Sequence, residues 1–521
     1  MLRPFPRLLV ATIVAIAAVP LIGLVPGAGV AAQQPDAALV ARARAIHERV
    51  ITMDTHNDIN ANNFTAECNY TMRLTTQVNL PKMVEGGLDV SFMIVYVGQG
   101  ALTPEGYDSA YRRAVALFDG VHRLTEVIAP DKIGLALTPD DVRKIAASGR
   151  KVAVIGIENA YSMGLDIARV KEFHDRGGRY MSLAHNGNSQ FADSNSSEAA
   201  KDFLYGDGLS DLGKQVIAEM NKWGIMVDLS HPSKGANLQA IKLSKAPVIA
   251  SHSAARALAN HSRNLDDETL AAIKKNGGVV QTVAFASYVK VDPPERTAAL
   301  AALRQEFGVT TGGAGRGGGG GRGAAAGGAA GAGAGGGAGA GVTPPVPTRG
   351  GAAADLTAAL TQVQGGRGGG ACSVEAPAGA TVAAGLPAGG TGRGGGGGRG
   401  GQNAALDALP AERRAEYDKR LADIDAKWPA AGRATVQDFV NHIDYLVKQV
   451  GIDHVGVSSD FDGGGGVTGW NSAAETFNVT LELVKRGYTE AQIAKIWSGN
   501  LLRVWGEVEK VAKDIQAGKI K

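Results

Sequence analysis

Short apolar runs alternate along this chain with longer stretches in which apolar residues recur at helical spacing. The runs are rich in Val and Ile, which is typical of strands buried in a parallel sheet. They lie near residues 51–57, 88–97, 152–158, 180–186, 224–230, 247–252, 278–284 and 454–460. Helical patterns cover 36–50, 109–125, 164–177, 210–223, 266–276 and 411–428, and another begins at Thr435, with Asp438 as a capping partner. This alternation predicts an α/β fold, and eight strands match a closed (β/α)8 TIM barrel.

A long segment interrupts the pattern between the seventh and the eighth strand. Residues 310–403 consist mainly of Gly, Ala and Arg, and the tract GRGGGGGRG occurs in them twice. This composition offers too little apolar surface to offset the entropy lost on ordering, so we expect a disordered insertion. Loop entropy grows slowly with length, so a single barrel made of residues 36–309 and 404–521 can tolerate it. Arg-Gly-Gly runs also occur in RNA-binding segments, but no aromatic residues are interleaved here, and we expect no nucleic-acid partner.

Residues 1–32 have the features of a secretory signal peptide. Two arginines precede an apolar stretch, and Val30-Ala31-Ala32 fit a cleavage site. We therefore expect export, either to the periplasm or out of the cell, and no membrane span in the processed protein. An uncleaved membrane anchor is the alternative, because the apolar stretch is close to the shortest length that crosses a bilayer.

Charge and cysteine content narrow the chemistry further. A net charge of +3, with 20% charged residues, favours neither a nucleic acid nor an acidic membrane surface as a partner. The two cysteines, Cys68 and Cys372, could form a disulfide in an exported protein, and the sequence leaves their pairing open. Two thiolates cannot build a four-cysteine site, so any metal would be held mainly by histidines and carboxylates.

Side chains of the kind that bind metals gather at the ends of the predicted strands. They are His56, Asp58, Glu158, His185, His231, His252 and Asp460. The remaining histidines fall in helical patterns, in a loop or at the opposite end of a strand. Because the carboxyl ends of barrel strands meet at one face, which carries the active site in such barrels, we predict a metal centre there.

These side chains could hold two ions. His56 and Asp58 are separated by one residue and share one face of an extended strand end, so they could grip one ion. His231 and His252 could hold the second ion, and the two oxygens of Glu158 could bridge the pair. Imidazole and carboxylate suit Zn²⁺, with Mn²⁺ or Co²⁺ as substitutes. A hydroxide held between two such ions would make the protein a metal-dependent hydrolase.

A set of short motifs accompanies these residues along the chain. They are DTHND at 54–58, IGIE at 155–158, YMSLAHN at 180–186, GLSDLG at 208–213, MVDLSH at 226–231, SHS at 251–253, RN at 263–264 and DHVGVSSDFDG at 453–463. Jointly they resemble the renal (membrane) dipeptidase family, and the resemblance extends from about residue 45 over nearly the whole chain, apart from the insertion. It implies an amidohydrolase-like barrel in which a hydroxide bridging two zinc ions hydrolyses dipeptides, including D-residue dipeptides and β-lactams. It also implies a homodimer.

The resemblance assigns a role to each candidate residue. The metal ligands would be His56, Asp58, Glu158, His231 and His252. His185 would contact the substrate carbonyl and stabilise the oxyanion, and Arg263 would bind the terminal carboxylate of the substrate. Asp460 would contact the substrate amine and carry protons. Arg256 competes with Arg263 for binding the terminal carboxylate of the substrate. Asp462 competes with Asp460 for contact with the amine and proton transfer.

Two loops depart from the family pattern, and one other reading stays open. Asn159-Ala160-Tyr161 and Phe191 stand where the family often has Gly-Gly-His and Trp, so the preferred side chains of the substrate stay undetermined. The alternative is another amidohydrolase-superfamily hydrolase, of the lactonase or phosphotriesterase type. Those enzymes usually open with H-x-H and carry a bridging lysine, and neither feature is seen here.

Overall fold

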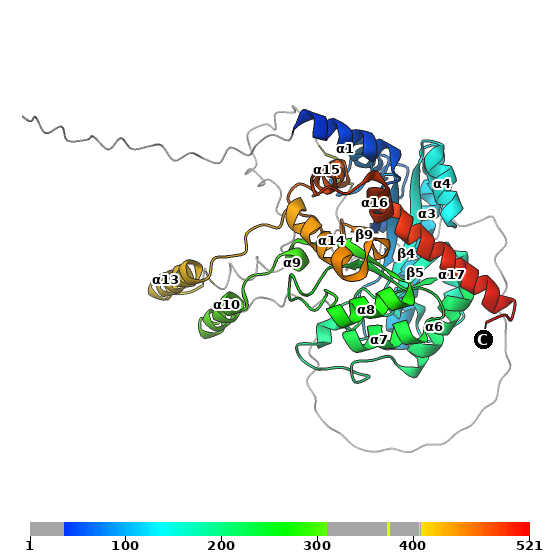
Figure 1. The fold of residues 1–521 in the computed structure, drawn as a ribbon. Coiled ribbons are helices and arrows are strands. Elements are labelled where there is room, and N and C mark those ends of the chain that lie inside the picture. Colours follow the sequence, from blue (N-terminus) through cyan, green and yellow to red (C-terminus); the bar gives the residue numbers. More distant parts are fainter. Residues whose placement is uncertain (1–35, 310–371, 376–405, 407, 521) are drawn as a thin grey trace, which may run out of the picture.

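The computed structural model describes residues 36–309, 372–375, 406 and 408–520. Its centre is a parallel sheet rolled into a barrel and surrounded by helices (Figure 1). The barrel strands are β1 (Met53–Asp58), β2 (Val90–Tyr96), β4 (Lys151–Glu158), β5 (Gly178–Ser182), β6 (Met226–Asp228), β7 (Ile249–Ser253), β8 (Val279–Val283) and β9 (Val455–Ser458). Each of these pairs with the next in that order. The predicted (β/α)8 barrel is therefore confirmed, with all eight predicted strands present.

Contacts just beyond β9 bring the first and the last strand together. The backbone N–H of Asp58 donates to the carbonyl of Phe461 at 2.9 Å, and Asn57 forms a parallel bridge with the same residue. The N–H of Ser459 donates to the carboxylate of Asp54, also at 2.9 Å. These bonds close the barrel at the end where β1 and β9 finish, which is the end that carries the candidate site.

Helices follow most of the strands, and most of these helices cover the outside of the barrel. They are α1 (Ala37–Arg49), α2 (Leu80–Gly86), α3 (Pro104–Arg123), α4 (Pro139–Ala147), α5 (Arg169–Asp175), α6 (Asp211–Trp223), α7 (Lys234–Leu243), α8 (Asp267–Asn276), α9 (Ala286–Val289), α10 (Pro294–Glu306), α13 (Ala411–Lys427), α14 (Val436–Val450), α15 (Phe477–Lys485), α16 (Glu490–Ala494) and α17 (Asn500–Gln516). Thr435 and Asp438 form the predicted capping box at the start of α14. The sequence analysis missed the short strand β3 (Ile133–Leu135), which pairs with the first three residues of β4.

The apolar core has two main parts. One lies between the sheet and the surrounding helices and includes residues such as Ile155 and Phe439. The other fills the barrel where the strands begin: Phe92 and Val154 pack there with Trp505 of α17. The C-terminal helix thus covers the end of the barrel opposite the candidate site. This leaves the polar side chains at the other end on an apolar base.

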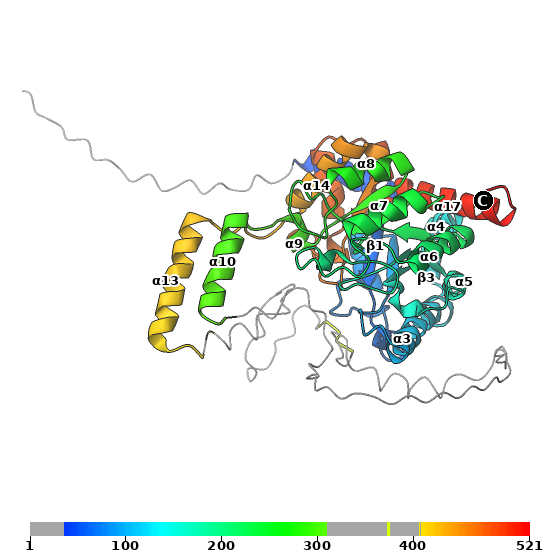
Figure 2. The same cartoon turned by 90° about the horizontal axis from the view of Figure 1, so that it is seen from below.

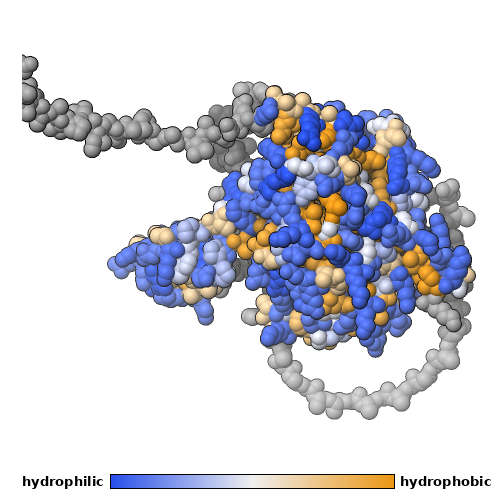
Figure 3. All heavy atoms as spheres, in the orientation of Figure 1, coloured by the Kyte–Doolittle hydropathy of each residue, from blue (hydrophilic) through white to orange (hydrophobic). Residues whose placement is uncertain are grey.

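Helices α10 and α13 lie side by side and project from the barrel (Figure 2). Their contact includes the rings of Phe307 and Tyr417, 5.4 Å apart. Figure 3 shows that hydrophilic residues cover most of the visible surface, including this projection. Among the residues described, no helix is long and apolar enough to span a bilayer. The predicted signal peptide over 1–32 lies outside the described residues, as does the predicted disorder of 310–403 except at 372–375.

A short piece of the insertion is attached to the loop after β1. Cys68 and Cys372 form a disulfide, which settles the pairing that the sequence left open. The N–H of Thr75 donates to the carbonyl of Ser373 at 2.8 Å, and Glu375 pairs with the buried ammonium of Lys82 at 2.5 Å. The same loop continues to Gln77 and Val78, whose backbone N–H groups donate to Asp462 beside the candidate site. The insertion is therefore joined to the barrel in its middle as well as at its two ends.

Reduction of this disulfide should lower the stability of the fold. The bond joins two residues that are 304 positions apart in the sequence. Losing such a cross-link typically lowers the free energy of unfolding by about 2–4 kcal/mol. We expect urea unfolding with reductant to give a free energy of unfolding lower by about this amount. A Cys68→Ser/Cys372→Ser double variant should match the reduced protein and should not respond to reductant. Equal stability of the oxidised and reduced forms would contradict the cross-link.

Candidate metal centre

The structure brings the predicted site residues together at the end of the barrel where the strands finish. His56 and Asp58 lie in β1, Glu158 is the last residue of β4, and His252 lies in β7. The others stand two or three residues beyond the strands that precede them: His185 after β5, His231 after β6 and Asp460 after β9. Most of these side chains are buried, so the cluster lies within the barrel mouth rather than on its surface.

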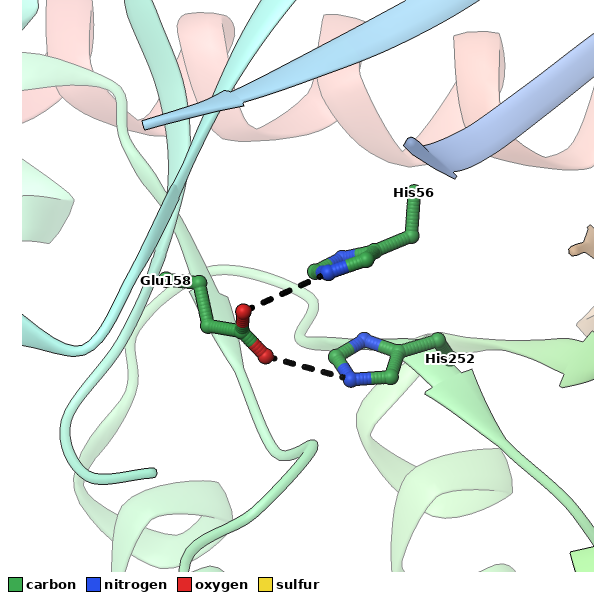
Figure 4. Close-up of side chains that lie close together, drawn as sticks. All are labelled: His56, Glu158 and His252. Atoms are coloured by element: carbon green, nitrogen blue, oxygen red, sulfur yellow. Dashed lines mark ion pairs between the residues drawn. The ribbon is translucent and has the colours of Figure 1, made fainter. Parts of the chain in front are cut away.

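The carboxylate of Glu158 is the meeting point of the histidines. The Nε2 atom of His231 lies 2.8 Å from its Oε1, and the Nε2 atom of His252 lies 3.4 Å from the same oxygen. The Nε2 atom of His56 approaches Oε2 at 3.5 Å. Figure 4 shows His56 and His252 pointing at this carboxylate from different strands. One carboxylate therefore contacts imidazoles on both of its oxygens, as a bridging ligand requires.

Two groups of metal-binding side chains share this carboxylate. His56 and His252 form one group with it, and His185 and His231 form the other. The sequence instead predicts His231 and His252 as the two ligands of one ion. In the structure His252 is close to both neighbours: its ring centroid is 3.8 Å from that of His56, and its Nε2 atom is 3.0 Å from that of His231. The division of the ligands between two ions stays a prediction.

Burial controls the electrostatics of the cluster. It raises the pKa of Asp58 to about 7, with the nearby charge of Glu158 as a further cause, and it raises the pKa of Glu158 to about 8. Burial also lowers the pKa of His185 to about 3 and holds those of His231 and His252 well below the usual value. Each charged form is costly here because no water compensates it.

A divalent cation fits this donor set. Neutral imidazoles and carboxylates are the ligands that zinc and similar ions take, and a cation would offset the cost of the buried negative charges. Within the described part of the chain, the Oδ1 atom of Asp58 has no hydrogen-bond partner, although it is buried. It lies 3.7 Å from the Nε2 atom of His56. An unpartnered buried oxygen beside an imidazole nitrogen is the arrangement expected of two ligands to one ion.

The loops that carry the site hold their backbone in conformations that L-residues seldom adopt. His231 has a φ of 83°, Asp460 of 58° and Asp462 of 61°. Next to them, a side chain at Gly463 would displace the carboxylate of Asp460, because a Cβ atom there would lie 2.2 Å from its Oδ1. Such strain persists only when the surrounding structure imposes it, and it is frequent at functional sites.

The structure separates the competing residues. Asp462 accepts the backbone N–H groups of Gln77 and Val78, at 2.8 and 3.2 Å, and so anchors the loop after β1. Asp460 is buried, and burial raises its pKa well above the usual value; the charges of Asp58 and Glu158 raise the pKa further, against an opposing effect of His56. Among the described residues, only Asp462 of the two aspartates has a side chain that anchors a backbone segment, so Asp460 is the better candidate beside the centre.

The two arginines also differ in their surroundings. Arg256 forms a two-pronged ion pair with Glu198 through Nη1 and Nη2, and its Nε donates to the side chain of Asn260. Arg263 is buried, donates from Nη2 to the carbonyl of His252 at 3.1 Å, and lies 5.4 Å from the ring centroid of Tyr288. Among the residues described, its Nε has no partner. Arg263 therefore has a donor to offer an anionic ligand at the centre.

Sequence reasoning missed the tyrosines around the histidines. The hydroxyl of Tyr180 lies 2.8 Å from Nδ1 of His56, and that of Tyr96 lies 3.5 Å from Nδ1 of His185. Tyr96 is the last residue of β2, so the strand-end rule that identified Glu158 could also have found it. Tyr180 lies within β5 and carried no such signal. Its position depends on Gly156 of the neighbouring strand.

A family model covers nearly the whole chain. Residues 40–519 match the model described as membrane dipeptidase, peptidase family M19. The chain is 34% identical over 230 residues to dipeptidase tcpJ of Claviceps purpurea, an alignment that covers 43% of this chain and 53% of that protein. It is 34% identical over 253 residues to dipeptidase aclJ of Aspergillus oryzae, covering 46% and 58%. The chain thus spans about half the length of the curated relatives it matches.

Solved structures share the whole architecture. A Pseudomonas aeruginosa protein described as the probable dipeptidase PvdM is 30% identical, with a TM-score of 0.62, and the match covers 91% of this chain and 99% of that one. A metallo peptidase from Rhodobacter sphaeroides, crystallised with a phosphinate mimic of the dipeptide L-Ala-D-Ala, is 19% identical with a TM-score of 0.54. That match covers 88% of this chain and 99% of the other chain, and at this identity it supports the fold alone.

Divalent cations should stabilise the folded protein. A ligand present at 100 times its dissociation constant adds about 2.7 kcal/mol to the free energy of unfolding. We therefore expect Zn²⁺ to raise the midpoint of thermal unfolding of metal-stripped protein. Glu158→Gln removes the shared charge and should lose most of this increase, whereas the exposed Glu105→Gln in α3 should retain it. An unchanged midpoint in the parent protein would contradict a metal centre.

Proposed function

The chain is a member of the membrane dipeptidase family, peptidase family M19, and on that basis we propose that it is a metallo-dipeptidase. Its substrates would be dipeptides with a free terminal carboxylate, and its reaction the hydrolysis of their peptide bond. The observation that carries this proposal is the buried carboxylate of Glu158, which imidazoles approach on both oxygens beside the partly unpaired guanidinium of Arg263.

We propose two zinc ions as the cofactor, with Mn²⁺ or Co²⁺ as substitutes. His56 and Asp58 would hold one ion, His231 and His252 the other, and Glu158 would bridge them. Ions held there supply Lewis-acid polarisation of the scissile carbonyl and a water of lowered pKa as the nucleophile. The contacts of Glu158 with the three histidines support its bridging role, and the division of the histidines between the ions rests on the family resemblance.

The residues around the ions would bind and orient the dipeptide. Arg263 would pair its free Nε–H and an Nη–H with the two oxygens of the terminal carboxylate. His185 would donate a hydrogen bond to the carbonyl oxygen as negative charge develops on it. The low pKa that burial imposes on His185 supports this role, because a neutral imidazole carries one N–H and does not repel the neighbouring cations.

Asp460 would carry the proton from the attacking water to the departing amine. A carboxyl group in this role has to accept a proton and release it again within one turnover. The raised pKa of Asp460, caused mainly by burial, favours the protonated form that the second half of the reaction needs. A Cβ atom at Gly463 would lie 2.2 Å from Oδ1 of Asp460 and 3.2 Å from Oδ2 of Asp58, so the two carboxylates are neighbours. This position keeps Asp460 close to the reacting groups.

Several finer points belong to the same proposal. Cleavage of D-residue dipeptides and β-lactams rests on the family resemblance, as does a homodimer. Export rests on the predicted signal peptide, and the disulfide suits an oxidising compartment. A lactonase or phosphotriesterase is less favoured, because the position between the two histidine groups is occupied by a carboxylate, not a lysine.

A panel of short peptides tests the substrate class. Zinc-loaded protein should release amino acids from L-Ala-L-Ala, and the same assay on L-Ala-D-Ala decides the D-residue question. The C-terminal amide of the first dipeptide should show a kcat/KM lower by roughly 10–100-fold, because a charge-assisted interaction with Arg263 is lost. If zinc-loaded protein cleaved no dipeptide in such a panel, the proposal would be wrong.

Asp460→Asn should separate proton transfer from metal binding. The amide cannot accept and return a proton, so we expect kcat to fall by about 10²–10⁴-fold while the metal content stays at the parental value. Asp462→Asn is the matched control. It alters the loop anchor and should change kcat by less than about tenfold. The reverse order of the two effects would assign the role to Asp462.

A further inference from the structure

Buried polar side chains lie next to the candidate metal ligands, on the side away from Glu158. Tyr180 of β5, Asp228 of β6 and Ser251 of β7 are each almost completely buried. None of them belongs to the set that the sequence analysis identified. Polar groups buried to this degree are costly unless they are hydrogen-bonded, so their partners show what they do.

The hydroxyl of Tyr180 determines which nitrogen of His56 carries hydrogen. It donates to the backbone carbonyl of Thr55 at 3.0 Å, and a carbonyl oxygen can only accept. The same hydroxyl oxygen lies 2.8 Å from Nδ1 of His56, so it accepts a hydrogen bond from Nδ1–H. A neutral imidazole has a single N–H. The lone pair of His56 therefore lies on Nε2, the atom that faces Glu158.

Ser251 has the same relation to His252. Its hydroxyl donates to Oδ2 of Asp228 at 2.6 Å, while the other oxygen of that carboxylate accepts two backbone N–H groups. The hydroxyl oxygen of Ser251 lies 2.8 Å from Nδ1 of His252 and accepts from it. Nε2 of His252 is then left with its lone pair, and this atom also faces Glu158, at 3.4 Å.

His231 completes the arrangement. Its Nδ1 atom lies 3.2 Å from the side-chain oxygen of Asn186, which can only accept, so Nε2 again carries the lone pair. Nε2 atoms of His231 and His252 are 3.0 Å apart, and both are near one carboxylate oxygen. Lone pairs so close repel one another, and a cation among them removes that repulsion.

The ring of Tyr180 occupies space that a side chain at position 156 would fill. A Cβ atom at Gly156 of β4 would lie 2.3 Å from the ring carbon that bears its hydroxyl. The ring also packs against Phe92 of β2, with centroids 5.6 Å apart. A side chain held on both sides cannot turn its hydroxyl away from His56.

We propose that Tyr180 and Ser251 are positioning residues for the metal centre. Each hydroxyl accepts the Nδ1–H of one histidine and so holds that histidine with its Nε2 lone pair directed at a metal ion. Tyr180 acts on His56 and Ser251 acts on His252, so under the ligand division of the proposed function the two hydroxyls serve different ions. This inference rests on the metal site of the proposed function and adds to it the residues that orient its ligands.

Zinc affinity of metal-stripped protein tests the proposal. Parent, Tyr180→Phe, Ser251→Ala and Tyr70→Phe are titrated against a chromophoric chelator. Parent protein should bind two ions per chain. Tyr180→Phe should weaken one ion by about 10–100-fold, and Ser251→Ala should weaken the other by a similar factor. Tyr70→Phe is the matched control, because it removes a buried hydroxyl that accepts the backbone N–H of Asn60 and not the N–H of a ligand imidazole. Its two affinities should stay within about twofold of the parent.

Thermal unfolding of the same metal-free proteins shows whether each variant is folded. Should Tyr180→Phe fail to fold, Ser251→Ala carries the test alone. Parental affinity for both ions in the folded variants would overturn the positioning role and leave the metal site intact. A parent protein that binds no zinc would overturn the proposed function, and the positioning role with it. Equal weakening in Tyr70→Phe would show a general loss of stability and would also overturn the proposal.

Discussion

The carboxylate of Glu158 is buried among imidazole nitrogens, and this arrangement constrains the residues around it. A buried negative charge is costly unless a positive charge or several donors accompany it. Here the nearest atoms are ring nitrogens that carry lone pairs, so hydrogen bonds do not supply the compensation. Cations bound there would offset this cost, which would couple metal binding to the stability of the fold.

The barrel makes this possible by ordering its contents in layers. Apolar side chains such as Phe92 and Trp505 fill the end where the strands begin. Tyr180 and Ser251 form a polar layer above them, and the histidines and carboxylates lie above that. Each layer depends on the one below it, because a side chain can be held in one orientation only by neighbours that are themselves fixed. Substitutions far below the site should therefore alter its chemistry as well as stability.

The described segments on either side of the long insertion lie next to each other. α10 and α13 lie side by side, with Phe307 in contact with Tyr417, so the chain leaves and re-enters through neighbouring positions. The disulfide from Cys68 to Cys372 adds a third attachment, on the loop after β1. That loop holds Asp462 through Gln77, two residues from Asp460. The insertion is thus joined to the barrel close to the site through a chain of backbone contacts.

Much of this protein followed from the sequence alone. The eight apolar runs identified the barrel, because burial on both faces requires such runs, and the polar residues that end them identified the site, because parallel strands finish at one face. Local patterns could not reveal β3, which is three residues long, or decide between Arg263 and Arg256 and between Asp460 and Asp462. Nor could they pair Cys68 with Cys372 or connect Gly156 with Tyr180. Those facts depend on contacts between residues distant in sequence, and such contacts exist only after the chain has folded.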